Sequence, residues 1–394
     1  MENNKQHPKT KVVINKKEFE RIRQTVANMV EGKRVQEQQA DNSRLPIDLG
    51  IFLTGKCNLR CKHCFEWNEN GFLTAEDLAC ANREIPIEYI KRCLEFTRPK
   101  KTRLYLWGGE PLLYSKLPEL CELLKEDPRW TTLCTNGLLV EKKLDILKPV
   151  SENLVLLTSL DGFEEAHELI RGKGTYQKTL DSIKLVTSLI KTGEFKGRQS
   201  VNCVLSEPML GKLYDFCAYM EEIGIDTLYM CLPWYISEES AERMDEFFDT
   251  RFQGVLERDK EKVPSWHDFK FSLGDENVQR LMDDMKKINS REWKIRIRFQ
   301  PAIQMDEVKE FIEGGCSCAQ NKKQCLAVVN RMDILQDGTM TACKMFKEFA
   351  IGNLKDHSVE ELWFSERYQQ IRAVLAKETM PICAKCVLMY LNGI

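Results

Sequence analysis

The 394-residue sequence has no stretch approaching about 18 uninterrupted apolar residues, the length needed for a membrane-spanning helix. Its first residues (MENNKQHPKTKVVINKK) lack the apolar core of a secretory signal. It also lacks an excess of charge of either sign, because the formal net charge is -2. These absences argue against a membrane protein and against a nucleic-acid or anionic-lipid partner. They predict a cytoplasmic protein.

The composition that remains is typical of a globular protein, with 43% apolar and 30% charged residues. A chain of this length exceeds one ordinary compact domain, so we expect two or three structural units. There are 16 cysteines. In a reducing compartment these are free thiols, metal ligands or catalytic groups rather than disulfides.

From Pro46 onward, short strand-like runs alternate with helical patterns. This alternation predicts βαβ crossovers and a parallel sheet. We therefore expect an α/β fold, a partial (βα)6 TIM-like barrel over residues 47–235. The six expected strands are 47–54, 102–107, 131–136, 153–162, 200–206 and 226–232.

Three further segments flank this predicted barrel. Residues 1–46 form an extension in which the apolar spacing of Phe19, Ile22, Val26 and Met29 indicates one amphipathic helix on a flexible lead. Residues 236–313 are expected to be a helical linker. Residues 314–394 form a cysteine-rich α+β domain, with a hairpin turning at Asp337-Gly338 and a helix capped by Ser358 and Glu361.

Three cysteines, Cys57, Cys61 and Cys64, lie directly after the first expected strand. A structural zinc site would need a fourth ligand, and His63 is too close to its neighbours to chelate comfortably. Iron–sulfur clusters are usually held by four thiolates, so three would leave one iron open to a substrate or cosubstrate. A half-formed zinc knuckle is the alternative.

Three more motifs follow the next expected strands. They are Trp107-Gly108-Gly109-Glu110-Pro111, Thr135-Asn136-Gly137, and Ser159-Leu160-Asp161-Gly162 with Arg171-Gly172 further on. With the C-x3-C-x2-C loop, they resemble the radical S-adenosylmethionine (radical SAM) enzyme family over residues 47–235. Ligand-binding groups at the carboxyl ends of successive strands also fit a barrel.

This resemblance implies that the three cysteines hold a 4Fe-4S cluster whose fourth iron binds S-adenosyl-L-methionine (SAM). The Gly108–Pro111 segment, including Gly109 and Glu110, would meet the amino group of SAM, where glycines allow close approach and a carboxylate suits an ammonium. The other implied SAM-binding residues are Ser159 and Asp161 near the ribose, Arg171 near the carboxylate, Asn136 beside the same site, and His63 as a planar ring against the adenine.

A second cysteine group lies near the C-terminus, in a C-x12-G-x4-C…C-x2-C arrangement. It resembles the SPASM and twitch domains, which carry auxiliary 4Fe-4S clusters in part of the radical SAM family. A full SPASM domain continues past its C-x2-C with further cysteines, whereas this sequence ends eight residues after Cys386. We therefore expect one auxiliary cluster, as in a twitch domain, ligated by Cys325, Cys343, Cys383 and Cys386, and at least one in any case. Cys316 and Cys318 are candidates for a further ligand, and a zinc ribbon is the alternative.

The remaining cysteines occur in apolar contexts and are expected to be small core residues. They are Cys80, Cys93, Cys121, Cys134, Cys203, Cys217 and Cys231. Trp67, Trp234 and Tyr235 are candidates for lining a substrate cavity, although aromatic residues are more often core. The sequence identifies no catalytic acid or base.

The resemblance implies reductive cleavage of SAM to a 5′-deoxyadenosyl radical that takes hydrogen from a substrate, with flavodoxin or ferredoxin as electron donor. The favoured substrate is a peptide or protein, modified by oxidation, crosslinking or epimerisation. Residues 1–46 contain no recognisable peptide-recognition domain, so a separate recognition protein could serve. A small-molecule dehydrogenase or isomerase is the second reading, and a non-catalytic iron or zinc protein the third.

Overall fold

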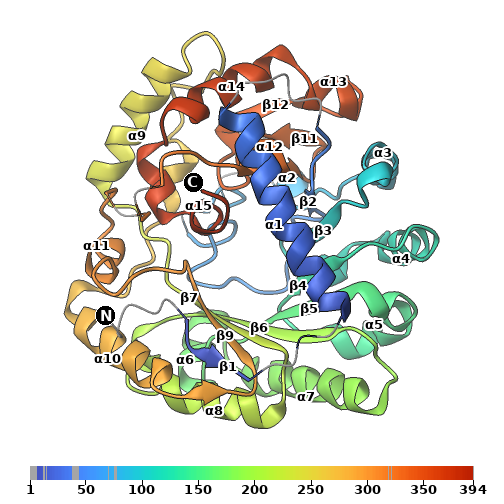
Figure 1. Cartoon of the computed structure of the whole chain (residues 1–394), viewed down its shortest axis with the longest axis vertical. Helices are drawn as coiled ribbons and strands as arrows, with labels where there is room; N and C mark the ends of the chain where they lie inside the picture. Colours follow the sequence, from blue (N-terminus) through green and yellow to red (C-terminus); the bar gives the residue numbers. More distant parts are fainter. Residues whose placement is uncertain are drawn as a thin grey trace.

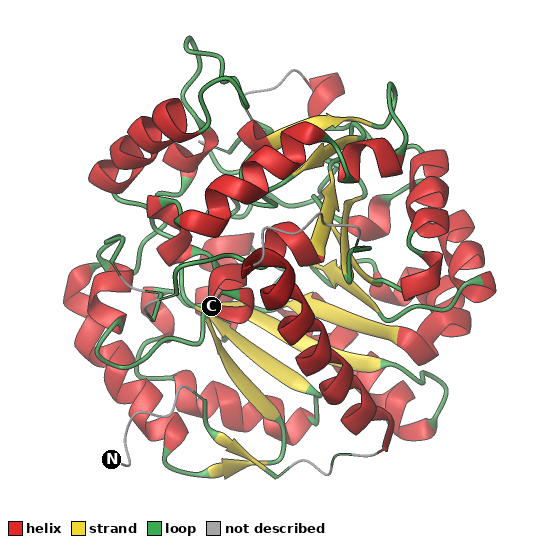
Figure 2. Ribbon diagram, turned by 45° about the horizontal axis from the view of Figure 1, so that its top comes forward, coloured by secondary structure: helices red, strands yellow, loops and turns green. Residues whose placement is uncertain are grey.

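The computed structural model describes residues 7–11, 14, 16–37, 44–69, 71–74, 78–317, 319–320 and 322–393. A ten-stranded sheet in the order β12-β11-β10-β2-β3-β4-β5-β6-β7-β9 forms its centre. Figure 2 shows these strands fanning out with helices around them.

The six strands expected from the sequence are all present and pair as parallel neighbours in chain order. Along β5, buried Leu154, Leu156 and Thr158 alternate with partly buried residues, as a strand between a helical layer and a cavity requires. The predicted α/β fold is confirmed. The strands are β2 (Asp48–Phe52), β3 (Arg103–Trp107), β4 (Thr131–Thr135), β5 (Leu154–Ser159), β6 (Arg198–Val204) and β7 (Thr227–Cys231).

Helices between these strands cover one face of the sheet (Figure 1). In α3, for example, Ile87, Ile90 and Leu94 are buried at helical spacing, which forms one apolar stripe against the strands. These helices are α3 (Ile87–Phe96), α4 (Leu117–Glu126), α5 (Val140–Leu147), α6 (Glu164–Arg171), α7 (Tyr176–Thr192) and α8 (Leu213–Ile223). The short α2 (Leu78–Ala81) is not part of this layer, because its Ala81 packs with Phe52 and Trp107 in a separate cluster.

The segment predicted to be a helical linker also contains strands. It carries α9 (Glu238–Arg251), α10 (Val278–Asn289) and α11 (Val308–Ile312), with the short β8 (Glu292–Trp293) and β9 (Arg296–Gln300). Strand β9 pairs in parallel with β7 and extends the sheet beyond the six expected strands. Ile297 and Phe299 alternate with basic residues there, and this period-two signal is obscured by the helical sequence that precedes it.

The C-terminal part joins the opposite edge of the same sheet, because β10 pairs in parallel with β2. The β10–β11 hairpin turns at Asp337-Gly338, as expected. A Cβ on Gly50 of β2 would lie 1.8 Å from an Asp333 carboxylate oxygen, so only glycine lets the β10 side chains pack this closely. The elements are α12 (Ala327–Asn330), β10 (Arg331–Ile334), β11 (Thr339–Thr341), β12 (Ala350–Asn353), α13 (Val359–Trp363), α14 (Glu366–Lys377) and α15 (Val387–Asn392).

The N-terminal segment forms β1 (Lys9–Thr10), which pairs with β8, and the long helix α1 (Lys16–Glu37). Figure 1 shows α1 crossing diagonally in front of the strands, and it contacts α12 and α14. The expected helix is present, but its apolar residues do not all face the core. Phe19, Ile22 and Val26 are exposed, while Arg21 stacks on the Trp130 ring.

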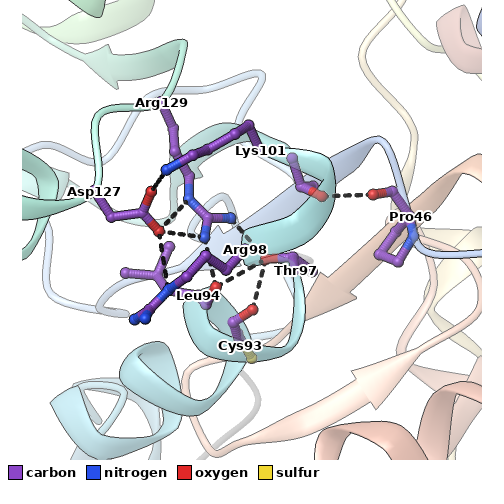
Figure 3. A network of polar contacts seen from close by, with 9 residues as sticks. Pro46, Cys93, Leu94, Thr97, Arg98, Lys101, Asp127 and Arg129 are labelled. Carbon is purple, nitrogen blue, oxygen red and sulfur yellow. Dashed lines mark hydrogen bonds and ion pairs between the residues drawn. The ribbon is translucent and has the colours of Figure 1, made fainter.

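A polar network fastens the amino end of β4 to the end of α3 (Figure 3). The Arg129 side chain is fully buried, and it donates to Asp127 Oδ2 at 2.6 Å, Thr97 Oγ1 at 2.7 Å and the Leu94 carbonyl. Lys101 forms a second ion pair with Asp127. Every charge in this network therefore has a partner.

Candidate functional site

A cavity of about 320 Å³ lies at the carboxyl ends of the strands. Parallel strands bring the residues at their ends to one edge of a sheet, which is where α/β proteins place their ligand sites. The lining residues from the sheet are Tyr105, Trp107, Cys134, Thr135, Leu157, Ser159, Asn202, Val204, Cys231 and Gln300.

The first cysteine group opens onto this cavity. Cys57, Cys61 and Cys64 all line it, and the Cys61 carbonyl accepts a hydrogen bond from the Cys64 backbone N–H at 3.0 Å. Burial raises the pKa of the Cys57 thiol to about 12, and it also raises the pKa values of Cys61 and Cys64. Bound iron would instead lower the pKa values of these thiols, because a coordinating thiol is deprotonated.

Arg171 places a positive charge beside one of the three thiols. Its Nη1 approaches Cys61 Sγ at 3.6 Å, so the guanidinium would stabilise a thiolate there. Within the described ranges, no three His, Cys, Asp or Glu side chains are arranged to hold a single metal ion. A 4Fe-4S cluster does not require that arrangement, since each cysteine binds a different iron.

The Gly108–Pro111 segment is tied to the cysteine loop by its backbone. The N–H groups of Gly109 and Glu110 donate to the carbonyls of Thr54 and Lys56 at 2.9 and 2.8 Å. A Cβ on Gly109 would lie 2.4 Å from the Lys56 carbonyl oxygen, so a glycine is needed here. Gly108, Gly109 and Pro111 line the cavity.

The Glu110 carboxylate does not line the cavity. It is fully buried and accepts hydrogen bonds from Thr135 Oγ1 at 2.8 Å, the Asn136 N–H at 2.8 Å and the Leu112 N–H at 3.0 Å. In this structure Glu110 therefore holds the loops after β3 and β4 together. Asn136, positioned by that bond, does line the cavity.

Asp161 links two of the other expected site residues. Its carboxylate accepts hydrogen bonds from Arg171 Nε at 2.6 Å and from the Val204 N–H at 3.0 Å. It also forms a hydrogen bond with His63 Nε2 at 2.8 Å. Burial alone would raise the pKa of Asp161, but Arg171 and the His63 ring hold it well below its usual value. Ser159, Arg171 and His63 line the cavity, whereas Asp161 lies behind them.

His167 also belongs to this network. Its Nδ1 accepts from the Asp161 backbone N–H at 3.1 Å. Its Nε2 is buried without a hydrogen-bond partner among the described residues. Burial lowers the pKa of His167 to about 4, so the ring is neutral near pH 7.

Aromatic side chains from the helical segment cover part of the cavity. Phe269 stacks on Phe65 with ring centroids 5.4 Å apart, and Phe271 meets His63 edge-on at 5.7 Å. Trp234, one of the aromatic candidates for a substrate cavity, lines the same cavity. Trp67 does not line this cavity. Its indole N–H donates to the Gly55 carbonyl at 2.7 Å, and Arg60 stacks on its ring.

Four charged residues that the sequence did not suggest also line the cavity: Glu66, Asp268, Lys270 and Lys344. Burial raises the pKa of Glu66 to about 8 and lowers that of Lys344 to about 8. Only the positions of Glu66 and Lys344 in the sequence could have suggested a place at the site, since Glu66 lies two residues after Cys64 and Lys344 directly follows Cys343. Cys134 and Cys231, expected in the core, line the cavity too.

The second cysteine group is brought together by the C-terminal part. The pKa of Cys325 rises to about 12 through burial and the charge of Cys386, and the pKa of Cys343 also rises through burial and the charge of Cys386. The pKa of Cys383 rises through burial and the charges of the other three. Cys316 donates to Ser240 Oγ at 2.7 Å, and Cys318 lies outside the described residues.

Two family models match the chain. The radical SAM superfamily model matches residues 51–196, and the SPASM model, an iron–sulfur cluster-binding domain, matches residues 325–387. The first range contains the loop of Cys57, Cys61 and Cys64, and the second contains four cysteines of the C-terminal group.

Several curated proteins are similar in sequence. Pre-heme d1 synthase of Dinoroseobacter shibae is 24% identical over 341 residues, which covers 85% of this chain and 76% of that protein. GTP 3′,8-cyclase of Clostridium perfringens is 35% identical over 141 residues, 34% of this chain and 41% of the cyclase. The subtilosin biosynthesis protein AlbA of Bacillus subtilis is 26% identical over 147 residues, 36% of this chain and 31% of AlbA.

Solved structures share the fold. Streptococcus suis SuiB bound to S-adenosylmethionine gives a TM-score of 0.55 at 18% identity, over 92% of this chain and 74% of SuiB. The protein anSMEcpe with bound AdoMet gives 0.55 at 19% identity, over 88% of this chain and 89% of that chain. These likenesses extend through both cysteine-bearing parts of the chain.

Proposed function

Because this chain belongs to the radical SAM superfamily and carries a C-terminal SPASM iron–sulfur domain, we propose that it is an oxidoreductase that modifies a peptide or protein. Its cofactors are a 4Fe-4S cluster, SAM and auxiliary iron–sulfur chemistry in the SPASM domain. Bound together, they supply one-electron cleavage of SAM, which enables removal of a hydrogen atom from a substrate.

In this proposal Cys57, Cys61 and Cys64 hold the SAM-binding cluster. Their thiols share one cavity, and Arg171 lies beside Cys61, which suits a site of accumulated negative charge. The surrounding polar groups that line the cavity would bind SAM. They are the backbone of Gly108 and Gly109 and the side chains of His63, Asn136, Ser159 and Arg171.

Asp161 and Glu110 would act as positioning residues. Asp161 fixes the orientation of both Arg171 and His63, and Glu110 fixes the backbone of Asn136. Phe65, Phe269 and Trp234 would exclude water from the reacting groups.

Cys325, Cys343, Cys383 and Cys386 would hold the auxiliary cluster. They lie close enough to influence one another's charge, and Lys344 and Val387, beside two of them, line the same cavity as the first cysteine loop. This shared cavity carries the proposal, because a substrate within it would meet both cofactor sites. An auxiliary cluster with four cysteine ligands would serve electron transfer.

The structural relatives support a peptide substrate. SuiB has been solved with the precursor peptide SuiA, and anSMEcpe with the Cp18Cys peptide. Flavodoxin or ferredoxin is the proposed electron donor, a separate peptide-recognition protein could assist, and the cytoplasm is the proposed location. Among the described residues, no helix is sufficiently long and apolar to cross a membrane.

A second candidate function is the modification of a small molecule or cofactor precursor. Pre-heme d1 synthase matches over 85% of this chain, and a tungsten-containing aldehyde ferredoxin oxidoreductase cofactor-modifying protein of Pyrococcus furiosus is 20% identical over 86% of it. Those relatives favour a substrate that is not a peptide.

Mass spectrometry would separate the two candidates. The enzyme is reconstituted without oxygen to about eight iron and eight sulfide per chain and incubated with SAM and dithionite. A peptide encoded beside its gene is added in one arm and a tetrapyrrole or pterin precursor in the other. Loss of the mass of two hydrogen atoms from the peptide would indicate oxidation, and deuterium uptake without another mass change would indicate epimerisation.

Two results would contradict the proposal. Modification of only the small molecule would replace it with the second candidate. Zinc in place of iron at both cysteine groups would remove both candidates.

A further inference from the structure

Lys344 lies in the cavity with an unusual set of neighbours. Its ammonium is 4.2 Å from the Tyr105 ring centroid and 4.5 Å from that of Trp107. Within the described part of the chain it has no hydrogen bond and no ion pair. Two aromatic faces stabilise a cation, but they leave the side facing the cavity without an anion.

Two acidic groups, Asp333 and Glu66, lie close enough to influence the charge of Lys344. Asp333 is already paired, because both of its oxygens accept from Arg331 at 2.7 Å. Glu66 lines the same cavity but is not within ion-pair distance of Lys344. Arg331 also lies close enough to influence Lys344, but its charge is balanced by Asp333, so Lys344 is the cation left to meet an incoming anion.

Glu66 is the complementary group. Its side chain is 5% exposed, and its Oε2 is buried without a hydrogen-bond partner in the described residues. A buried carboxyl oxygen without a donor is destabilising, and a bound N–H group would remove that cost. The cavity therefore presents an unpaired cation and an unpaired acceptor from two different parts of the chain.

We propose that Lys344 binds a carboxylate of the substrate while Glu66 accepts a hydrogen bond from an N–H of the same molecule. An acidic residue of a peptide offers both groups, through its side chain and its backbone amide. This inference rests on the proposed function, and it names the substrate class as one bearing a carboxylate. Lys344 is a specificity-determining residue, since it selects the group that is presented to the radical chemistry.

Binding measured without turnover tests this assignment. Reconstituted enzyme loaded with SAM, but not reduced, is dialysed to equilibrium against N-acetyl-glutamate methylamide or the neutral N-acetyl-glutamine methylamide. We expect the glutamate probe to bind about 10- to 100-fold more tightly, because the desolvated ion pair is lost with glutamine. A third arm with glutarate distinguishes an amino-acid residue from a simple diacid.

Substitutions of Lys344 separate its charge from its packing. Lys344→Met should bind both probes equally, Lys344→Arg should keep the preference for glutamate, and Lys344→Glu should prefer N-acetyl-lysine methylamide. Lys270→Met is the matched control, because Lys270 also lines the cavity but already pairs with Glu238 at 2.7 Å. It should keep the wild-type preference.

Equal binding of both amide probes by the wild type, or an unchanged preference in Lys344→Met, would overturn the inference. A weakened SAM affinity in Lys344→Met with equal iron content would also overturn it, since Lys344 would then serve the cosubstrate. None of these measurements requires SAM cleavage, so a failure of the proposed function would appear separately.

Discussion

The two ends of the parallel sheet differ in whether their charged side chains have partners within the chain. At the amino end of β4, Arg129 satisfies Asp127, Thr97 and the end of α3, and no charge in that network is left over (Figure 3). At the carboxyl end, Glu66 and Lys344 face a cavity without partners. A buried charge that is paired within the chain stabilises the fold, whereas a cation and a carboxyl oxygen left without partners are suited to a ligand.

The largest expected effect is at the carboxyl end. Replacing Cys57, Cys61 and Cys64 together by Ala should abolish 5′-deoxyadenosine formation from SAM, because no thiolate remains to hold the first cluster. Chromatography of the products under dithionite measures this. The auxiliary iron should remain, and formation at the wild-type rate would refute the ligand assignment.

At the amino end the expected effect is on stability. Arg129→Met should lower the free energy of unfolding by about 3 kcal/mol, since it leaves Asp127 and two acceptors of α3 without their buried donor. Thermal denaturation measures the change. Lys101→Met is the control, because this partner of Asp127 is 57% exposed and should cost less than about 1 kcal/mol.

Asp161 sharpens the comparison, because it is a fully paired charge at the carboxyl end. Asp161→Asn should weaken SAM binding about 10- to 100-fold, as Arg171 and His63 lose their fixed orientation. Equilibrium dialysis with SAM measures this. Asp226→Asn is the matched control, since Asp226 precedes β7 at the amino end and pairs with Arg296 at 2.8 Å. Equal SAM affinities in both variants would contradict the positioning role.

The smallest expected effect is a pH dependence from His167. Its pKa in the folded protein, about 4, lies below the usual 6.5, so protonation favours the unfolded chain. The neutral His167 ring contributes fully to stability above pH 6.5, and this contribution declines as the pH falls toward 4. Between pH 6.5 and 5.5 the free energy of unfolding should fall by about 1 kcal/mol. His167→Asn, which keeps an acceptor for the Asp161 N–H, should flatten the denaturation midpoints over that interval.

Sequence patterns predicted the features that are set by neighbouring residues in the chain. The six strands from β2 to β7 have clear apolar runs, and the cysteine spacings identify both iron–sulfur regions. Strand β9 was missed because the helical sequence before it suggested a longer linker. The exposed apolar residues of α1 could not be foreseen, since periodicity shows that Phe19 and Ile22 share a face but not what covers it.

The roles of site residues depend on contacts that the sequence does not encode locally. Glu110 and Asp161 were expected at the cosubstrate, but each is occupied by several protein donors. Glu66 and Lys344 are separated by more than half of the chain and meet only after the C-terminal part joins the sheet. Neither belongs to a motif that spacing could reveal.

The pairing of β10 with β2 makes the C-terminal part a structural neighbour of the first strand rather than an attached module. If the chain were cut after β9, β2 would become an uncovered edge strand with free backbone donors and acceptors. Such edges promote aggregation through intermolecular strand pairing. The two cysteine-bearing parts are therefore expected to be recovered together as one folding unit, and a chain truncated after β9 should accumulate as insoluble protein.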